Sequence, residues 1–230
     1  MILSRHKLHQ LGLIASIKDN VIRHGYAFVP EYRPDEPIVS IAHALGRPLA
    51  LWQNRLVQEL IPRPIAPPNT YSGIFGLQRF PLHTDLAHWR LPPPYLLLRC
   101  VKGYAEVPTQ IVDGRTLIEA ISQDILTRAI VKPRRPQNGS LILLRLCEFV
   151  DERYCFRWDE VFLRPASRVG DVASKAIRAL LNSSEPSSIP LVQAGDMLLV
   201  DNWRILHGRS PIPAGREDRK IERIYLERLH

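Results

Sequence analysis

Apolar residues recur every three to four positions in four stretches of the chain, which is the spacing of an amphipathic helix. These stretches predict helices over residues 7–23, 37–45, 116–130 and 171–181. Glycine supplies a stop signal after the first two, at Gly25 and Gly46. The front of the chain is therefore expected to be largely helical.

Short apolar runs bounded by turn residues, most of them after residue 71, are typical of β-strands. We expect strands over residues 26–29, 95–101, 109–112, 141–150, 154–163, 197–200 and 221–226. Four prolines between residues 62 and 68 indicate an extended connection. Strands dominate the middle and end of the chain, with helices at the front and in the connections. This order favours a mainly β fold with flanking helices, a β-sandwich or jelly roll.

A length of 230 residues suits one domain with a substantial core. We expect a single domain over residues 1–230, with a helical N-terminal part at 1–70 and a β core at 71–230. The hydrophobic share of 45% and the charged share of 23% are ordinary for a globular protein and argue against a disordered chain.

A net charge of +8 is compatible with binding to nucleic acid. The cations are scattered and form no block of like charge, so the charge alone does not indicate such a partner. Three cysteines without a C-x-x-C pair exclude a disulfide framework and a zinc knuckle, and they fit a reducing cytoplasm. No apolar run reaches the about 18 residues of a membrane span, and the N-terminus lacks the unbroken apolar stretch of a signal peptide. We expect a cytoplasmic protein without a membrane partner.

Two histidine segments far apart in the chain carry the candidate chemistry. His83, Thr84 and Asp85 form an H-x-D triplet, and on a strand the outer two residues would point to the same face. By itself the triplet is a weak signal, because an aspartate that caps a turn gives the same pattern. His207 supplies the third element, since it follows a predicted buried strand and precedes Gly208. Two histidines and one carboxylate form the facial triad of non-haem Fe(II) oxygenases.

Oxygenases of this kind that use 2-oxoglutarate also need a cation for its distal carboxylate. Arginine suits this because its planar fork binds a carboxylate through two hydrogen bonds. Arg219 lies 12 residues beyond His207, and Arg223 follows four later on a predicted strand. Both would face the same side of that strand. Arg216 is a rival for the cosubstrate position, because the loop before the strand has no fixed length.

Residues 80–85 (FPLHTD) and 201–209 (DNWRILHGR) resemble the two metal segments of the taurine dioxygenase/clavaminate synthase-like (TauD/TfdA) family of Fe(II)/2-oxoglutarate-dependent dioxygenases. The resemblance extends from about Tyr71 to the C-terminus. It implies a double-stranded β-helix (jelly roll, cupin-like) as the catalytic core at 71–230. It also implies a metal centre that uses Fe(II), with 2-oxoglutarate and O₂ as cosubstrates.

The resemblance implies a role for each of six residues. His83, Asp85 and His207 would bind iron, and Thr109 and Arg219 would bind 2-oxoglutarate. Arg223 resembles a second family arginine near the substrate or the other end of the cosubstrate. The alternatives are a plain strand residue for Thr109 and a surface ion pair for Arg223. His88 is either a pocket residue or a surface residue.

These features favour a dioxygenase that oxidises a small organic substrate, such as an amino acid or organic acid, and releases succinate and CO₂. Related halogenases replace the carboxylate with a small residue, so Asp85 favours hydroxylation or desaturation over halogenation. Two alternatives stay open. One is a binding or regulatory β-helix module without turnover. The other is a nucleic-acid-modifying oxygenase, which no interleaving of aromatic and basic residues supports.

Overall fold

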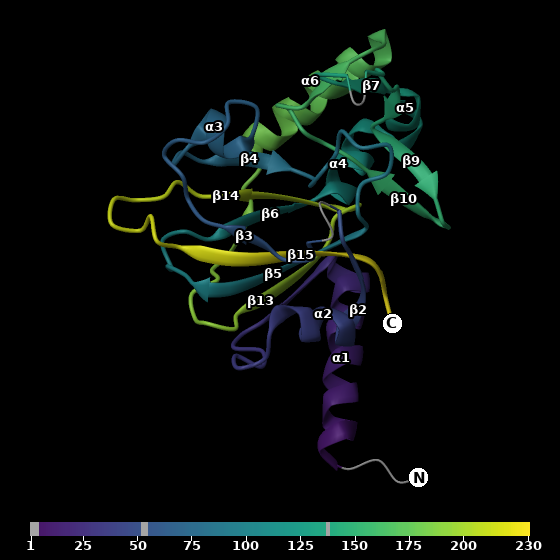
Figure 1. Ribbon diagram of the computed structural model, residues 1–230. Helices are drawn as coiled ribbons and strands as arrows, with labels where there is room; N and C mark the ends of the chain where they lie inside the picture. The colour runs from purple at the N-terminus through teal and green to yellow at the C-terminus, as the bar shows by residue number, and fades with distance from the viewer. Residues whose placement is uncertain (1–4, 52–54, 137–138) are drawn as a thin grey trace.

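Two antiparallel sheets of unequal size form the centre of the molecule (Figure 1). The computed structural model describes residues 5–51, 55–136 and 139–230. The larger sheet has the strand order β1 (Tyr26–Val29), β13 (Met197–Asp201), β5 (Tyr95–Lys102), β15 (Lys220–Leu229) and β2 (Gly46–Leu49), and β3 (Gln58–Leu60) also pairs with β15. The smaller sheet has the order β12 (Ser187–Ile189), β6 (Thr109–Asp113), β14 (Ile205–Arg209) and β4 (Phe80–His83).

The inner faces of the two sheets share one apolar core. Leu96 and Leu98 of β5 pack in it with Ile111 of β6 and Ile205 of β14. The residue between the two leucines, Leu97, points to the opposite face, because successive side chains of a strand alternate. Since both faces are buried, β5 reads as a continuous apolar run rather than an alternating one.

Two helices cover the outer face of the larger sheet. α1 (Arg5–His24) and α2 (Ile38–Leu45) contribute Ile17, Val21 and Ile41 to a cluster with Leu97 and Leu199. In Figure 1 both helices lie below the sheet, on the side away from β14 and β6. The predicted helices at 7–23 and 37–45 are confirmed, and Gly46 follows the second one.

A third group of elements packs against the far side of the smaller sheet and lies at the top in Figure 1. Its core joins Leu82 and Leu206 of the sheet to Leu117, Leu126 and Ile177. The group consists of α4 (Gly114–Ile121), α5 (Gln123–Arg128), α6 (Arg168–Ser183), β7 (Ile130–Pro133), β8 (Leu144–Arg145), β11 (Leu163–Pro165) and the hairpin β9 (Cys147–Val150) with β10 (Arg153–Phe156). A short helix, α3 (Tyr71–Phe75), precedes β4.

The expected fold class, mainly β with flanking helices, is confirmed, and the differences are local. The helix expected at 116–130 is two helices, because Ser122 has a φ of 86° and ends the first. The strand expected at 154–163 ends at Phe156. Beyond it, the carboxylate of Asp159 accepts hydrogen bonds from the backbone N–H groups of Val161 and Phe162, which replace strand pairing. Residues 1–70, expected to be largely helical, also supply β1, β2 and β3.

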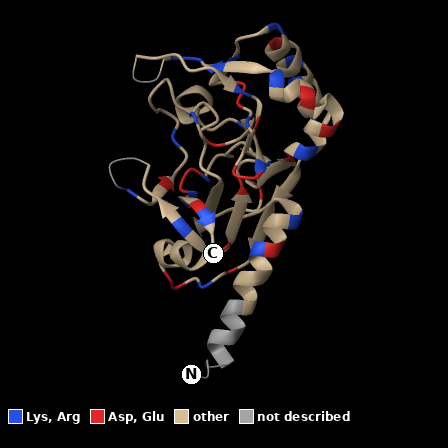
Figure 2. Ribbon diagram, turned by 90° about the vertical axis from the view of Figure 1, so that its right-hand side faces the viewer, with Lys and Arg blue, Asp and Glu red and all other residues tan. Residues whose placement is uncertain are grey.

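Acidic and basic residues are interspersed over the elements seen in Figure 2, as the scattered cations of the sequence predict. In the described part of the chain, no helix is both long and apolar enough to cross a membrane.

Candidate active site

A cavity of about 770 Å³ opens between the two sheets. His83, Asp85 and His207 lie in its wall, and all three side chains are buried. His83 is the last residue of β4 and lies directly opposite His207 of β14 in the antiparallel register. The sheet therefore brings together two residues that are 124 positions apart in the sequence.

The three side chains converge on one point. Asp85 Oδ1 lies 3.4 Å from His83 Nε2 and 3.5 Å from His207 Nε2, and one ligand atom from each residue lies within 4.8 Å of the other two. His83 Nδ1 is 2.9 Å from the carbonyl oxygen of Pro81. With Nδ1 held by this carbonyl, Nε2 is the ring nitrogen directed at the carboxylate: it donates to Asp85 when the ring is protonated, and in the neutral ring it has a lone pair for a cation. Such a cluster of electron-pair donors fits a divalent cation.

The other oxygen of Asp85 is held by two donors from β15. Arg223 Nη1 and the Tyr225 hydroxyl each donate a hydrogen bond of 2.9 Å to Asp85 Oδ2. This division leaves Oδ1 directed at the two imidazoles. Tyr225 is a residue that the sequence reasoning missed, although it stands two positions after Arg223 and so shares its strand face.

The charge of Asp85 is stabilised despite its burial. Burial alone would raise the pKa of this carboxyl, but Arg223 and the hydrogen bonds from His207 and His83 outweigh it and hold the pKa well below its usual range. For the imidazoles burial favours the neutral ring. It prevails in His207, whose pKa is lowered, whereas the interactions with Asp85 raise the pKa of His83.

The backbone at Asp85 is fixed by a buried amide. Asn202 Oδ1 accepts from the backbone N–H of Asp85 at 2.7 Å, and Asn202 Nδ2 donates to the carbonyl oxygens of Asp85 and Pro93 at 3.0 and 2.9 Å. Asn202 belongs to the second histidine segment, so this side chain joins the two segments. The sequence showed the asparagine but gave no sign of its partner.

The contacts of Asp85 predict the effect of Tyr225→Phe. This change removes one of the two donors that orient the carboxylate, and outer-shell partners of this kind contribute about 10- to 100-fold to metal affinity. We therefore expect Fe(II) or Mn(II) to bind at least about tenfold more weakly, as measured by anaerobic metal titration. Tyr154→Phe is the matched control, because Tyr154 is an exposed residue of β10 whose hydroxyl contacts Gln123 of α5, away from the cavity. Equal metal affinity of the Tyr225→Phe variant and the wild type would contradict this role.

Arg219 is a buried arginine that faces the cavity. Its side chain lines the cavity and is 5% exposed, and burial lowers its pKa to about 10. Its Nε has no hydrogen-bond partner among the described residues, and no described carboxylate pairs with it. A buried cation in this state is costly unless a ligand compensates it.

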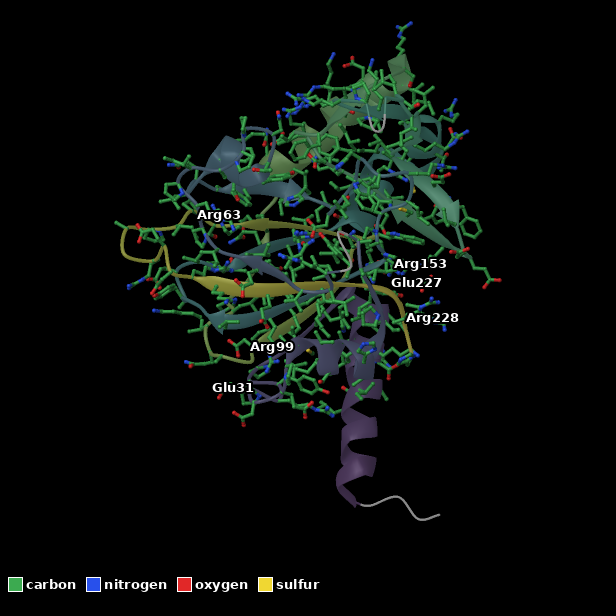
Figure 3. All side chains as sticks on the ribbon, in the orientation of Figure 1. Glu31, Arg63, Arg99, Arg153, Glu227 and Arg228 are labelled. Atoms are coloured by element: carbon green, nitrogen blue, oxygen red, sulfur yellow. The ribbon has the colours of Figure 1, made fainter. Side chains whose placement is uncertain are left out.

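In two other buried arginines the guanidinium group is compensated by backbone carbonyl oxygens. Arg99 donates to the carbonyl oxygens of Arg33, Pro34 and Glu36, and Figure 3 shows it below the larger sheet, near the loop that carries Glu31. Arg157 donates to the carbonyl oxygens of Ala87, Trp89 and Arg90, and so anchors the loop that follows Asp85. Arg219 differs from both because its guanidinium faces a cavity.

Thr109 and Arg209 lie near Arg219 at the same end of the cavity. Thr109 begins β6, is buried and stands opposite Arg209 of β14. Arg209 donates to the carbonyl oxygens of Gly76 and Gln78, and its guanidinium lies 3.7 Å from the centre of the Phe80 ring. Burial lowers the pKa of Arg209 to about 10, and the neighbouring charge of Arg219 acts in the same direction. This end of the cavity is therefore strongly positive.

The structure also separates the alternatives left open by the sequence. Arg216 is partly exposed and pairs with Glu106, whereas Arg219 lines the cavity. Arg223 faces the triad rather than a surface carboxylate. His88 lines the same cavity and packs beside Phe162, with ring centres 5.7 Å apart.

The comparisons with known proteins agree with this geometry. No protein-family model matches the chain. Gamma-butyrobetaine dioxygenase from Homo sapiens is 27% identical over 177 residues, a match that covers 63% of this chain and 43% of that enzyme. The same enzyme from Pongo abelii matches equally. The match thus spans less than half the length of these relatives.

Solved structures with the same fold cover nearly the whole chain. An asparagine oxygenase in complex with Fe(II), 3-hydroxyasparagine and succinate has a TM-score of 0.71 at 16% identity, over 96% of this chain and 79% of that one. The non-haem iron oxygenase OrfP, in complex with Fe and α-ketoglutaric acid, has a TM-score of 0.69 at 20% identity, over 94% and 79%. PvcB from Pseudomonas aeruginosa has a TM-score of 0.66 at 18% identity, over 93% and 79%. The chain therefore has the cupin-like jelly-roll fold of the TauD/TfdA-like Fe(II)/2-oxoglutarate oxygenases, as its two histidine segments predicted.

Proposed function

We propose that this protein is an Fe(II)- and 2-oxoglutarate-dependent dioxygenase that hydroxylates or desaturates a small organic substrate and releases succinate and CO₂. The observation that carries the proposal is the convergence of His83, Asp85 and His207 in a cavity that also contains Arg219, a buried arginine with which no described carboxylate pairs. The iron, succinate, α-ketoglutaric acid and hydroxylated amino acids bound to the structural neighbours support it.

In this proposal His83 Nε2, His207 Nε2 and Asp85 Oδ1 would hold Fe(II). When bound, the iron and 2-oxoglutarate supply the O₂ chemistry that oxidises a C–H bond. Arg219 would pair with the distal carboxylate of 2-oxoglutarate, and Thr109 would donate a hydrogen bond to the cosubstrate.

The remaining residues orient the ligands and exclude water. Arg223 and Tyr225 fix the Asp85 carboxylate through Oδ2. Leu98 and Ile221 form apolar walls beside the positive end of the cavity. A low-polarity wall strengthens the pairing of Arg219 with a carboxylate, because bulk water no longer screens it.

We also propose that residues 1–230 act as one domain. Residues 1–70 supply β1, β2 and β3 to the sheet that contains β15, and β15 carries Arg223 and directly follows Arg219. The N-terminal part thus completes the wall of the site.

The direct test is succinate formation by the purified chain with Fe(II), 2-oxoglutarate and O₂. We expect slow succinate release without a substrate, faster release when the right small molecule is added, and none when Fe(II) or O₂ is omitted. Calorimetry with 2-oxoglutarate under anaerobic conditions measures cosubstrate binding separately. Binding of 2-oxoglutarate without succinate release under any condition would favour a non-catalytic β-helix module instead.

A further inference from the structure

The loop between β4 and β5, residues 84–94, forms part of both the metal site and the cavity wall. Asp85 supplies a candidate metal ligand, and Leu86, His88 and Trp89 line the cavity. No residue of this loop, all of which the structure describes, belongs to a strand or a helix. The contacts that hold the loop in place therefore also set the direction of the Asp85 carboxylate.

The backbone of this loop is strained directly after the metal ligand. Leu86 has a φ of 56°, in the left-handed region that glycine adopts readily and residues with a side chain avoid. The backbone N–H of Trp89 donates to the carbonyl oxygen of Leu86 at 2.8 Å and closes a turn there. A residue in this region keeps its conformation only where the surrounding structure fixes it. The turn after Asp85 therefore needs contacts from outside the loop.

Arg157 supplies such contacts to the middle of the loop. Its Nη1 donates to the carbonyl oxygens of Ala87 and Trp89 at 3.1 and 2.6 Å, and its Nη2 donates to that of Arg90 at 3.3 Å. The donors of a guanidinium lie in one plane and point in fixed directions. Three hydrogen bonds from one such group fix the orientation of the backbone just after Leu86.

The ends of the loop are held by residues of the second histidine segment. Asn202 bonds to the backbone of Asp85, and Trp203 Nε1 donates to the carbonyl oxygen of Pro92 at 2.8 Å. Arg157 belongs to neither histidine segment. It is therefore a separate support, and it acts on the part of the loop between these two ends.

The Arg157 side chain is itself held in one place. It is 0% exposed, and it directly follows β10. Its backbone N–H donates to the carbonyl oxygen of Leu146 at 2.8 Å, and Glu148 Oε2 lies 3.5 Å from Nη2. Arg157 is not among the described residues that line the cavity. Three carbonyl oxygens and one carboxylate, rather than a ligand, thus compensate this buried charge.

We propose that Arg157 is a positioning residue of the metal centre. By binding the carbonyl oxygens that follow Leu86, it keeps the strained turn in place and so directs the Asp85 carboxylate at the two histidines. This inference rests on the proposed function, because it takes His83, Asp85 and His207 as the metal ligands. Arg157 acts only through the backbone of the loop and touches neither the metal nor the cosubstrate.

The test measures binding of Co(II), in place of Fe(II), to the full chain. The visible absorption bands of bound Co(II) depend on the geometry of its ligands. Arg157→Met removes all the donors of the side chain. We expect it to bind Co(II) at least about tenfold more weakly and with altered absorption bands, because groups that orient a metal ligand contribute about 10- to 100-fold. Arg157→Lys keeps the charge without the planar fork, and it is expected to recover part of the affinity.

Arg99→Met is the matched control. Arg99 is also buried and also donates to three backbone carbonyl oxygens, but it holds the loop near Glu36 on the other side of the larger sheet. Its loss is expected to lower the melting temperature and to leave the affinity and the absorption bands of Co(II) unchanged. Thermal unfolding of each variant separates lost stability from lost metal binding.

Unchanged Co(II) affinity and absorption bands in folded Arg157→Met would overturn the inference. The same loss of Co(II) in Arg99→Met would also overturn it, since the effect would then follow from stability alone. Where Arg157→Met does not fold, Arg157→Lys and Arg99→Lys are compared by the same two criteria. If His83→Ala binds Co(II) as tightly as the wild type, the metal site of the proposed function fails. If His83→Ala loses Co(II) and Arg157→Met does not, only the role of Arg157 fails.

Discussion

Replacing His207 or His83 with alanine is expected to abolish succinate formation and to weaken Fe(II) binding by more than about 100-fold. Each change removes one of three donors that meet at a single point, and direct ligands contribute more than the about 10- to 100-fold of the groups that orient them. Asp85 Oδ1 would then face only one imidazole. Anaerobic metal titration and succinate release measure the two effects independently.

His43→Ala is the control for these variants, because His43 is an exposed residue of α2. It should bind Fe(II) and release succinate as the wild type does. Both triad variants must keep the far-ultraviolet circular dichroism of the folded chain for the comparison to hold. Wild-type turnover in a folded His83→Ala variant would refute the assignment of the metal site.

Arg219→Ala is expected to raise the dissociation constant of 2-oxoglutarate by about 100-fold or more. A guanidinium that pairs with a carboxylate through two charge-assisted hydrogen bonds contributes about 1.5–3 kcal/mol for each, and each 1.4 kcal/mol corresponds to a factor of ten. Arg219→Lys should restore only part of this affinity, since an ammonium lacks the planar fork. Calorimetry with the Fe(II)-loaded chain checks both variants.

Arg216→Ala is the matched control, because the sequence alone could not choose between the two arginines. Arg216 is partly exposed, pairs with Glu106 and does not line the cavity, so its loss should leave the affinity for 2-oxoglutarate unchanged. The assignment of Arg219 would be wrong if Arg216→Ala lost the cosubstrate and Arg219→Ala kept it.

Local pattern was enough to predict most of the helices and strands. The helix at 7–23 and the strand at 197–200 follow from periodicity and apolar runs, which depend on neighbouring residues only. The pattern failed at Ser122, whose φ of 86° ends the helix, and after Phe156, where backbone N–H groups bond to the side chain of Asp159 instead of a neighbouring strand. The connection 157–162 carries Arg157 and Asp159, so this local error concealed part of the cavity wall.

The sequence by itself determined the chemistry of the candidate metal site. An H-x-D triplet, a later histidine after a buried strand and arginines beyond it define a donor set that few other sites need. The resemblance to a family of oxygenases rests on the same residues. These residues form short sequence motifs with defined spacing, and such motifs can be recognised without knowing how the chain folds.

Only the tertiary structure decided which charges the site uses and what compensates them. Arg219 is buried in the cavity and no described carboxylate pairs with it, whereas Arg216 pairs with Glu106 outside the cavity. Tyr225 and Asn202 hold Asp85 from positions more than 100 residues away. The physical reason is that the free energy of a charge depends on its desolvation and on nearby groups, and in this chain both are set by contacts between strands that are distant in sequence.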